Sequence, residues 1–517
     1  FSGSAYTTVF GCMLITQVKL RQGKMTDATD HTSALENENQ GQCIIDIPER
    51  NNDDICIYRV PPHLHQVNNK AYTPQLISIG PFHHGKHEFK AMEVHKRRYH
   101  QEFQKRNLKK TVLEFREYIE KTEGDIRKCY AEKSMLSSVD FVDMIELDAV
   151  FIMEFLLRSR KAEKNLHNHE YKDDYVLSKP WLKNNIELDL ILLENQIPFF
   201  ILTELYTFVD VRYQMTEENG EEMEGGYCPY FVGKEFSCEN CFTSHVHKGE
   251  KHGKDDVTED MAAVAGGFLG LACDYFEHYH PNKKAKHIRV EEKEVRHFTD
   301  LIRRFYIPYD LVSSGSTTFL DDDILYSATK LQEAGVTFKA VSDRCLLDIK
   351  FKKEKYLYYL PCLSFLPFKK FVKARLELPK LTVEGKTERV LRNLIALEQC
   401  HYPYHQYICN YIALIDDLIY SNNDVDLLLQ ENVIVNRLGN HAAVTEMINS
   451  LAKEIVISST CYEKLIKKLN AHHNVIWNRR MAILRSVYFR DLWRTSSTIV
   501  GLAVLAFTFI SFFRSMD

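Results

Sequence analysis

From position 188 to position 209 the chain reads Leu188-Asp-Leu-Ile-Leu-Leu-Glu-Asn-Gln-Ile-Pro-Phe-Phe-Ile-Leu-Thr-Glu-Leu-Tyr-Thr-Phe-Val209. Three consecutive polar residues, Glu194-Asn-Gln, and the proline Pro198 interrupt this otherwise apolar run. Polar groups are costly in hydrocarbon and proline breaks a helix, so the run is a poor membrane span. It predicts instead two short buried helices that meet at Pro198, and this places the run in a protein core.

Helical patterns lie on both sides of this run. Residues 87–123 carry a broken apolar stripe among many charges. Ser138 is a candidate N-cap for a second helix, whose wide apolar face is typical of a central core helix. The patterns return at 290–306, at 323–334 and over most of 387–489.

Extended structure is expected in two places. Prolines and glycines between residues 55 and 86 argue against a helix and predict extended chain with turns. Gly335–Phe338, Leu346–Phe351 and Leu376–Val383 alternate or run apolar with β-branched residues, which predicts a small sheet. The expected fold class is therefore mainly α, a multi-helix globular domain with a small β-sheet element.

The C-terminal end carries a further prediction. The segment 495–513 has no charged residue, and as a helix it would be about 28 Å long, enough for a hydrocarbon core. It predicts one C-terminal transmembrane helix with membrane lipid as its partner. Five arginines between 479 and 494 precede the segment and only Arg514 follows it. The positive-inside rule then predicts a single-pass, tail-anchored protein with a cytosolic domain, in the plasma membrane or an endomembrane.

Composition narrows the choice of partners. The chain has 517 residues, 45% of them hydrophobic, which is enough for a sizeable core, and its 66 Lys+Arg stand against 71 Asp+Glu. Because no global basic field exists, nucleic acid is not an expected partner. The 13 cysteines are scattered, mostly among apolar neighbours. They indicate buried thiols in a reducing compartment.

Three segments look peripheral to the domain. Residues 1–24 contain a short apolar stretch whose basic residues follow rather than precede it, so we expect an extension before a natural start at Met25. Residues 25–54 are polar and acidic and predict a disordered arm. Residues 211–260 show little periodicity and predict a long surface insertion.

Several ordered blocks carry a family resemblance. They include Ile57-Tyr-Arg-Val-Pro, Ala71-Tyr-Thr-Pro, Ser78-Ile-Gly-Pro-Phe-His-His-Gly, Leu193-Glu-Asn-Gln-Ile-Pro-Phe-Phe, Ser327-Ala-Thr-Lys-Leu-Gln-Glu-Ala-Gly-Val and Leu391-Arg-Asn-Leu-Ile-Ala-Leu-Glu-Gln-Cys. Together they resemble the plant domain of unknown function 247 family, whose domain would cover about 55–490. The chain departs from the family pattern at 354–373, an apolar, aromatic insertion where the family has a short turn. A retained intron would explain it.

The resemblance implies a function class rather than a reaction. Family members usually end in one membrane segment, and no catalytic or cofactor-binding residues can be carried over. Some grass members are implicated in self-incompatibility. The resemblance thus implies a membrane-tethered, non-catalytic interaction or recognition protein with an unknown protein partner, including a role in self/non-self signalling. The alternative is an uncharacterised hydrolase or metal-dependent enzyme that uses the histidine-rich segments.

Two groups of residues are candidates for metal binding. Cys238 and Cys241 form a Cys-x-x-Cys pair followed by His245 and His247, a donor set that Zn²⁺ accepts. Their close spacing is unlike that of a zinc finger, and a flexible polar insertion explains them as well. A denser histidine group has no carboxylate or cysteine at a familiar ligand spacing, so roles in turns and caps are favoured for its members: His63, His65, His83, His84 and His87.

Acidic residues supply the remaining candidates. Glu194 and Asn195 stand in an apolar run, where burial would raise the pKa of the carboxyl group, yet a hydrogen-bonded core role is favoured. The acidic groups Asp143/Glu146, Asp321–Asp323 and Asp416–Asp417 fit structural roles better than metal binding. Searches for phosphate-binding, dinucleotide-binding, nucleophile-elbow and zinc-protease motifs find none. We therefore predict no catalytic residues and no cofactor.

Overall fold

The apolar run at 188–209 folds around its proline. Helix α6 (Pro180–Leu190) ends before the polar triplet, and α7 (Phe199–Phe208) begins directly after Pro198, which is its N-cap residue. Every residue from 186 to 199 is buried. The two short buried helices are therefore confirmed, although an eight-residue turn, 191–198, separates them. Below, this segment is called the polar turn.

The computed structural model describes residues 54–107, 109–164, 174–209, 267–280, 294–308, 311, 318–319, 324–342, 344–356, 371–475 and 492–514. All of these residues lie in one compact unit, Asp46–Asp517. The predicted extension at 1–24, nearly all of the predicted arm at 25–54 and the whole predicted insertion at 211–260 lie outside these ranges.

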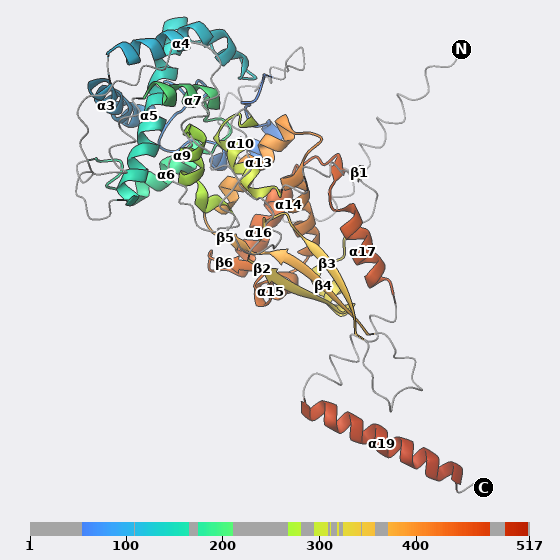
Figure 1. Ribbon diagram of the computed structural model, residues 1–517. Helices are drawn as coiled ribbons and strands as arrows, with labels where there is room; N and C mark the ends of the chain where they lie inside the picture. The colour runs from blue at the N-terminus through green and yellow to red at the C-terminus, as the bar shows by residue number, and fades with distance from the viewer. Residues whose placement is uncertain are drawn as a thin grey trace, which may run out of the picture. The chain divides into compact units, whose positions relative to one another are not determined.

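Helix α5 (Ser138–Lys164) is the centre of the N-terminal helices. It contacts α3 (Lys90–Arg106), α4 (Lys109–Lys128), α7 and α9 (Gly267–Tyr275), which surround it in Figure 1. Its apolar side chains from Phe141 to Leu156 are buried, except the half-buried Leu147, so the predicted core helix is confirmed.

Two details of these helices differ from the prediction. The cap of α5 is Ser137, whose hydroxyl accepts a hydrogen bond from the backbone N–H of Asp140 at 3.2 Å, and not Ser138. The pattern at 87–123 is divided into the turn η2 (His87–Phe89), α3 and α4. The division follows from Asn107, which has extended backbone (φ −96°, ψ 153°) and ends α3.

The segment 55–86 is mostly extended, with one exception. Helix α2 (Pro62–Val67) and the turn η1 (Asn69–Ala71) form where the prolines argued against a helix. Pro61 is the N-cap of α2 and Pro62 its first residue. A proline at these positions displaces no helical hydrogen bond, since the N–H groups of the first turn have no intrahelical acceptor.

The C-terminal helices pack around α13. Helix α13 (Thr387–His401) contacts α10 (Phe298–Tyr306), α14 (Tyr407–Leu418) and α16 (His441–Ala452). The shorter helices α12 (Ala328–Glu333), α15 (Asn422–Gln430) and α17 (Glu463–His473) extend this group, with α15 against α16. In Figure 1 this group and the N-terminal helices lie side by side.

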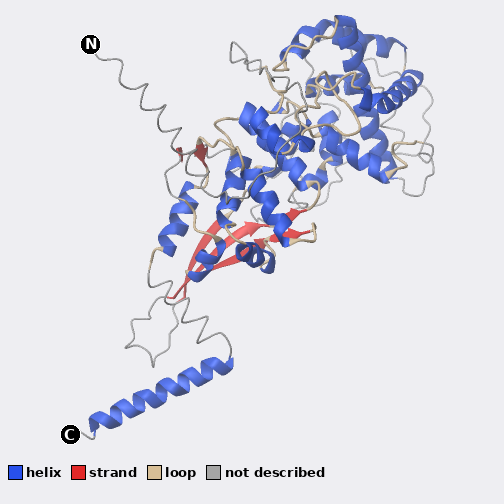
Figure 2. Cartoon of the chain, turned by 180° about the vertical axis from the view of Figure 1, so that it is seen from behind, coloured by secondary structure: helices blue, strands red, loops and turns tan. Residues whose placement is uncertain are grey.

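Among the described residues, strands form three small sheets. The largest has the order β2-β4-β3, in which β2 (Val336–Val341) is parallel to β4 (Phe371–Pro379) and β3 (Lys350–Tyr356) is antiparallel to it. Strand β5 (Leu381–Val383) pairs in parallel with β6 (Ile434–Asn436), and β1 (Thr318–Phe319) pairs antiparallel with β7 (Ser459–Thr460). Figure 2 shows the three-stranded sheet beside the helices. The predicted small β-sheet element is confirmed.

Both ends of the segment 354–373 belong to the three-stranded sheet. Its first three residues belong to β3 and its last three to β4, and the two strands pair from Lys350↔Glu377 to Tyr356↔Phe371. The strands therefore extend into the segment as one hairpin. Residues 357–370 lie outside the described ranges.

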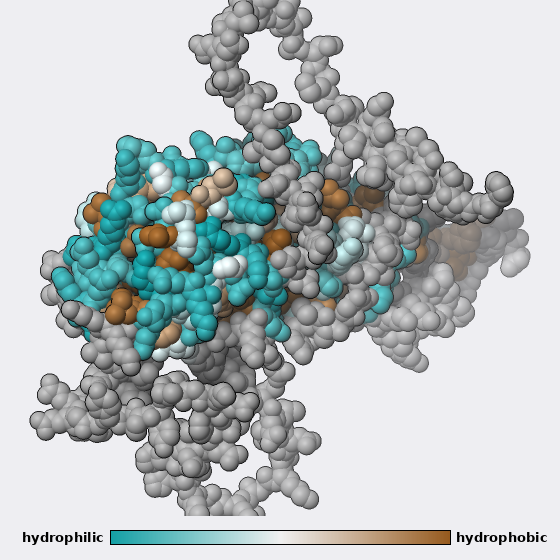
Figure 3. All heavy atoms as spheres, turned by 90° about the horizontal axis from the view of Figure 1, so that it is seen from above, coloured by the Kyte–Doolittle hydropathy of each residue, from teal (hydrophilic) through white to brown (hydrophobic). Residues whose placement is uncertain are grey.

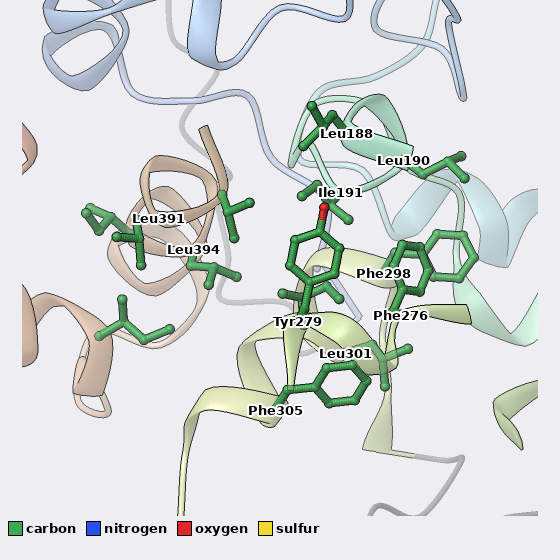
Figure 4. Close-up of a cluster of buried hydrophobic side chains, with 14 of the residues drawn as sticks. Leu188, Leu190, Ile191, Phe276, Tyr279, Phe298, Leu301, Phe305, Leu391 and Leu394 are labelled. Atoms are coloured by element: carbon green, nitrogen blue, oxygen red, sulfur yellow. The ribbon is translucent and has the colours of Figure 1, made fainter. Parts of the chain in front are cut away.

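One apolar core connects most of these elements. Figure 4 shows part of it, where the ring of Tyr279 from the turn η4 (Glu277–Tyr279) lies between Leu391 and Leu394 of α13 and the rings of Phe276 and Phe298. The hydroxyl group of Tyr279 points toward Ile191 in the polar turn. The core thus joins α13, η4, α10 and the polar turn.

The C-terminal prediction needs correction. Helix α19 (Leu492–Arg514) includes the predicted span at 495–513. Within the described ranges, however, no helix combines the length and the apolar content needed to cross a membrane. The predicted transmembrane helix is therefore wrong, and so is the single-pass, tail-anchored localisation derived from it. Contact with membrane lipid stays a prediction. The prediction relied on the absence of charge, but α19 also carries six serine and threonine hydroxyls, and hydroxyl groups are costly in hydrocarbon.

Candidate functional site

The polar turn is a hydrogen-bonding centre inside the apolar core. Asn195 is fully buried; its Oδ1 accepts a hydrogen bond from the backbone N–H of Ile79 at 2.7 Å, and its Nδ2 donates to the carbonyl groups of Ile77 and Asp189, both at 3.0 Å. Gln196 donates to the carbonyl groups of Leu190, at the end of α6, and of Leu192, and it accepts from the backbone N–H of Phe298. The turn thereby binds the extended segment 77–79 on one side and α10 on the other.

Asp189 extends this centre from the end of α6. Its carboxylate accepts hydrogen bonds from three successive backbone N–H groups, those of residues 75–77, at 2.7–3.1 Å. Arg389 of α13 donates to the same carboxylate at 2.5 Å. Because both the carboxylate and the guanidinium are buried, each compensates the charge of the other.

Asn393 joins the centre from the next turn of α13. Its Oδ1 accepts from the backbone N–H of Leu193 at 3.0 Å, and its Nδ2 donates to the carbonyl group of Ala71 at 2.9 Å. Three parts of the chain that lie far apart in the sequence are therefore held together: the segment 71–80, the end of α6 with the polar turn that follows it, and α13.

Gly80 lies against the backbone of the polar turn. It has φ +71°, and a Cβ atom at this position would lie 2.3 Å from the carbonyl oxygen of Gln196. Its N–H donates to Asp148 of α5 at 2.7 Å, and the ammonium group of Lys96 donates to the other oxygen of the same carboxylate at 2.6 Å. Only glycine fits this space and this backbone conformation without strain.

Glu194 and His83 form the pair in this centre that most resembles a catalytic acid–base pair. The Nε2 of His83 donates to Glu194 at 3.1 Å, and Lys86 donates to the Nδ1 of the same ring at 2.9 Å. Burial raises the pKa of Glu194, but hydrogen bonds from His83 and from the backbone N–H of Val60, with the nearby charge of Arg59, outweigh it and lower the pKa overall. This reverses the rise expected from burial alone.

The pair has little capacity for proton transfer to a substrate. Both ring nitrogens of His83 are already hydrogen-bonded, and the side chains of His83 and Glu194 are each 4% exposed. A general base needs an open lone pair facing the reacting group. The geometry instead fixes the turn at 80–86 to the polar turn.

A groove opens on the surface beside α13. It has a volume of about 890 Å³ and is lined from α2, α13, α15 and α16 and the segments next to them. We call it the α16 groove. Its walls mix apolar side chains, amides and charges of both signs: Val67, Asn68, Glu384, Gly385, Glu388, Arg392, Asn422, Leu438, Ala442, Ala443, Thr445, Glu446, Met447, Asn449, Ser450 and Lys453.

Comparison with known proteins places the chain in a family. Residues 57–507 match the family described as plant protein of unknown function, DUF247. The chain belongs to this family.

The DUF247 chain has two relatives in Arabidopsis thaliana among the curated proteins. The UPF0481 protein At3g47200 is 26% identical over 489 residues, which cover 89% of this chain and 85% of the relative. The putative UPF0481 protein At3g02645 is 22% identical over 525 residues, which cover 89% and 91%. No solved structure matches the chain.

Several of the blocks that carried the DUF247 resemblance meet in space. Val60 of the first block donates its N–H to Glu194, Gly80 of the third approaches Gln196, and Asn393 lies beside Leu193. The family pattern in this chain therefore describes the buried hydrogen-bonding centre. The sequence pointed to Glu194 and Asn195 because they interrupt an apolar run. In the structure both side chains are buried in the core and hydrogen-bonded.

The other histidine candidates do not converge. His65 stacks on Tyr72 with ring centroids 5.8 Å apart, His63 and His87 are exposed, and His84 is half-buried. Within the described ranges, no group of three or more His, Cys, Asp or Glu residues could hold a metal ion. The candidate ligands Cys238, Cys241, His245 and His247 lie outside these ranges, so they stay a prediction.

The acidic groups fall into three cases. Asp143 and Glu146 both accept from Arg116, at 2.7 and 2.8 Å, which supports a structural role. Asp416 and Asp417 lie on α14. Asp321–Asp323 lie outside the described ranges.

Several buried polar residues had escaped the sequence analysis. Glu398 of α13 is fully buried, and its carboxylate accepts from Arg303 at 2.9 Å and from the backbone N–H groups of Ile408 and Cys409. His297 caps α10, since its Nδ1 accepts from the backbone N–H of Asp300. A charged residue inside an apolar helical stripe, as at Glu398, is the signal that could have revealed such positions.

Proposed function

We propose that this DUF247 protein is a non-catalytic interaction or recognition protein that binds a segment of a partner polypeptide in the α16 groove. The observation that carries the proposal is the groove itself, about 890 Å³ in volume and walled by apolar, amide and charged side chains together. Small-molecule sites are mainly apolar, whereas protein interfaces combine apolar and polar contacts. The self/non-self role suggested by the grass relatives is one form of such recognition.

The α16 helix supplies the recognition surface. Ala442, Glu446 and Asn449 recur at the spacing of one helical face, and Lys453 follows as the C-cap residue. All four line the groove and are exposed. Within the described part of the chain, the side chains of Glu446, Asn449 and Lys453 make no hydrogen bond or ion pair. These three side chains are therefore available to a partner's backbone and charged groups.

The opposite wall of the groove is fixed by hydrogen bonds. Glu388 of α13 accepts hydrogen bonds from Asn68 and Arg392, both at 2.8 Å, and Arg392 also donates to Ser450 of α16 at 2.9 Å. A prearranged wall lowers the entropic cost of binding. This contrast between a fixed wall and free side chains suits recognition of an extended segment.

Proximity labelling in plant cells tests the proposal. We expect Glu446→Lys to remove specific proteins from the labelled set, because reversing one charge in the groove repels a partner that matches the native surface. Glu117→Lys is the matched control, since it makes the same change on an exposed position of α4. The control should label the same set as the native protein.

Two results would contradict the proposal. One is a labelled set that is identical for the native protein, Glu446→Lys and the double variant Ala442→Arg/Asn449→Arg, in which two bulky cations occupy the groove. The other is an equal loss of labelled proteins in the control. Circular dichroism of each purified variant establishes that the fold is intact before the sets are compared.

A further inference from the structure

A second hollow of the molecule has the character of an anion-binding site. It is a cavity of about 290 Å³ between the carboxyl ends of β2 and β4, the start of α13, the turn η4 and the end of α10. We call it the basic cavity. It is lined by His278, Tyr279, His280, Tyr306, Val341, Ser342, Arg344, Leu346, Lys380, Leu381, Thr382, Glu384, Lys386, Thr387, Val390 and Leu391.

The charged residues among the described lining of the basic cavity favour a negatively charged ligand. Arg344, Lys380 and Lys386 come from three different segments, and Glu384 is the one carboxylate among these lining residues. That carboxylate is already engaged, with Lys386 at 3.5 Å and with Arg437 at 3.3 Å. Lys380 is exposed and makes no ion pair within the described part of the chain.

Arg344 is held with one donor group unused. Its Nη2 donates to Glu377 at 2.8 Å, and its Nε lies 3.7 Å from Asp348. Its Nη1 is buried and has no hydrogen-bond partner among the described residues. A buried donor without an acceptor is costly, so an acceptor that enters the cavity and reaches this group would relieve that cost.

The backbone adds to the positive character. Helix α13 begins at Thr387 on the wall of the cavity. The first N–H groups of a helix lack intrahelical acceptors, and the helix dipole favours a negative charge at that end. The parallel pair β2 and β4 also ends here, at Val341 and Pro379.

The rest of the wall combines apolar and aromatic side chains with two histidines and the hydroxyl residues Ser342, Thr382 and Thr387. In Figure 4 the ring of Tyr279 stands beside Leu391, and its hydroxyl group points away toward Ile191. That hydroxyl donates to Glu187 at 2.8 Å, so the ring rather than the hydroxyl faces the cavity. The ammonium group of Lys386 lies 5.2 Å from the centre of the same ring. A bound molecule therefore meets positive charge and apolar surface together.

We propose that the basic cavity binds a small organic anion, with a carboxylate or phosphate head group and a compact apolar or aromatic body. Arg344, Lys380 and Lys386 hold the head group, and Tyr279, Leu381 and Leu391 contact the body. The volume of about 290 Å³ fits a molecule of roughly the size of a substituted benzene ring, at the lower end of ligand pockets. This site is separate from the partner recognition proposed for the α16 groove and does not depend on it.

Isothermal titration calorimetry on the full chain tests this assignment. The probes are benzoate, phenyl phosphate, inorganic phosphate and the neutral analogue benzamide. We expect saturable binding at one site per chain for benzoate or phenyl phosphate, with the tighter of the two identifying the head group. Benzamide should bind at least about tenfold more weakly because it lacks the charge, and inorganic phosphate more weakly because it lacks the apolar body.

Variants locate the binding. Lys380→Met should weaken the binding of the better anion about tenfold, since it removes one charge-assisted contact. Lys339→Met is the matched control on an exposed position of β2 outside the cavity and should leave the affinity unchanged. Lys386→Gln, on another wall, should repeat the effect of Lys380→Met.

Three results would overturn the assignment. The first is the absence of saturable binding of both organic anions up to about 10 mM, a concentration at which even weak sites fill. The second is equal affinity for benzamide. The third is an affinity that changes in neither cavity variant. The Glu446→Lys variant of the α16 groove should bind the anion normally, so a failure here and a failure of the proposed interaction role can be told apart.

Discussion

At the scale of single residues, burial alone does not predict the direction in which the pKa of a side chain is shifted. Glu194 is 4% exposed, yet its pKa is lowered, because a histidine, a backbone N–H and an arginine charge outweigh the burial. Sequence reasoning could see that Glu194 stands in an apolar run. It could not see these partners, since Val60 lies 134 residues and His83 lies 111 residues away.

Asn195 allows a direct test of the buried centre. We expect Asn195→Ala to lower the free energy of unfolding by about 3 kcal/mol or more, because it leaves the N–H of Ile79 and two carbonyl groups without partners in the core. Asn184→Ala, an exposed position on α6, should change it by less than about 0.5 kcal/mol. Urea unfolding measures both, and equal effects would refute the central role of Asn195.

His297 makes the stability depend on pH. Burial lowers its pKa from 6.5 to about 4, which keeps the ring neutral. A neutral ring is needed, because Nε2 donates to the carbonyl group of Cys56 while Nδ1 accepts from the N–H of Asp300. Between these two pH values the unfolded chain binds more protons than the folded chain, so the free energy of unfolding falls as the pH falls.

The size of this effect is measurable. From pH 7 to pH 5 we expect His297 to account for a loss of about 2 kcal/mol of stability. In His297→Asn the side chain still offers an acceptor to cap α10 but does not titrate, so this part of the loss should disappear. Urea unfolding at both pH values gives the comparison. The same pH dependence in the variant and the native protein would disprove the assignment.

At the scale of elements, regular patterns and the break at Pro198 were predicted correctly, whereas other breaks were not. The core helix α5 and the small sheet were predicted from the spacing of apolar residues, and the two helices around Pro198 from an apolar run that a proline interrupts. The break at Asn107 and the short helix α2 were missed. Both depend on a single residue's backbone conformation, which changes the hydrophobic pattern too little to be detected.

Gly80 shows how one residue positions two elements. We expect Gly80→Ala to destabilise the protein by more than about 3 kcal/mol or to prevent folding, because the new Cβ would lie 2.3 Å from the carbonyl oxygen of Gln196. Gly85→Ala is the matched control. It has a similar φ of +78° but no neighbour within 4 Å, and should cost only about 1–2 kcal/mol of backbone strain.

Soluble yield and urea unfolding measure the two glycine variants. Equal losses would mean that backbone strain alone, and not the approach to the polar turn, explains the requirement for glycine at position 80. Because a failure of Gly80→Ala to fold is itself a predicted result, the stability of Gly85→Ala decides between the two explanations.

At the scale of the whole molecule, α13 unites the two halves of the described domain. Arg389 and Asn393 contact Asp189 and Ala71, residues 200 and 322 positions away. The ring nitrogen of His401, at the end of the same helix, lies 3.1 Å from the hydroxyl group of Tyr58. Such contacts predict that the two helical groups unfold together.

Calorimetry checks this cooperativity. We expect one thermal transition for the full chain. Arg389→Met should move the whole transition to lower temperature, since it leaves the Asp189 carboxylate buried without its partner, at a cost of about 3–5 kcal/mol. The exposed Arg437→Met should move it little. Two separate transitions, or a shift in only one of them, would show independent halves.

The sequence alone determined the class of the fold, the family and the positions of the main helices and strands, because these depend on local periodicity and on ordered motifs. It also led to a transmembrane helix at 495–513 that the structure does not support, since absence of charge is a weaker criterion than apolar content. Tertiary structure decided which polar residues satisfy one another and where the α16 groove and the basic cavity open. Those features depend on side chains brought together across hundreds of residues, and no local pattern records such pairings.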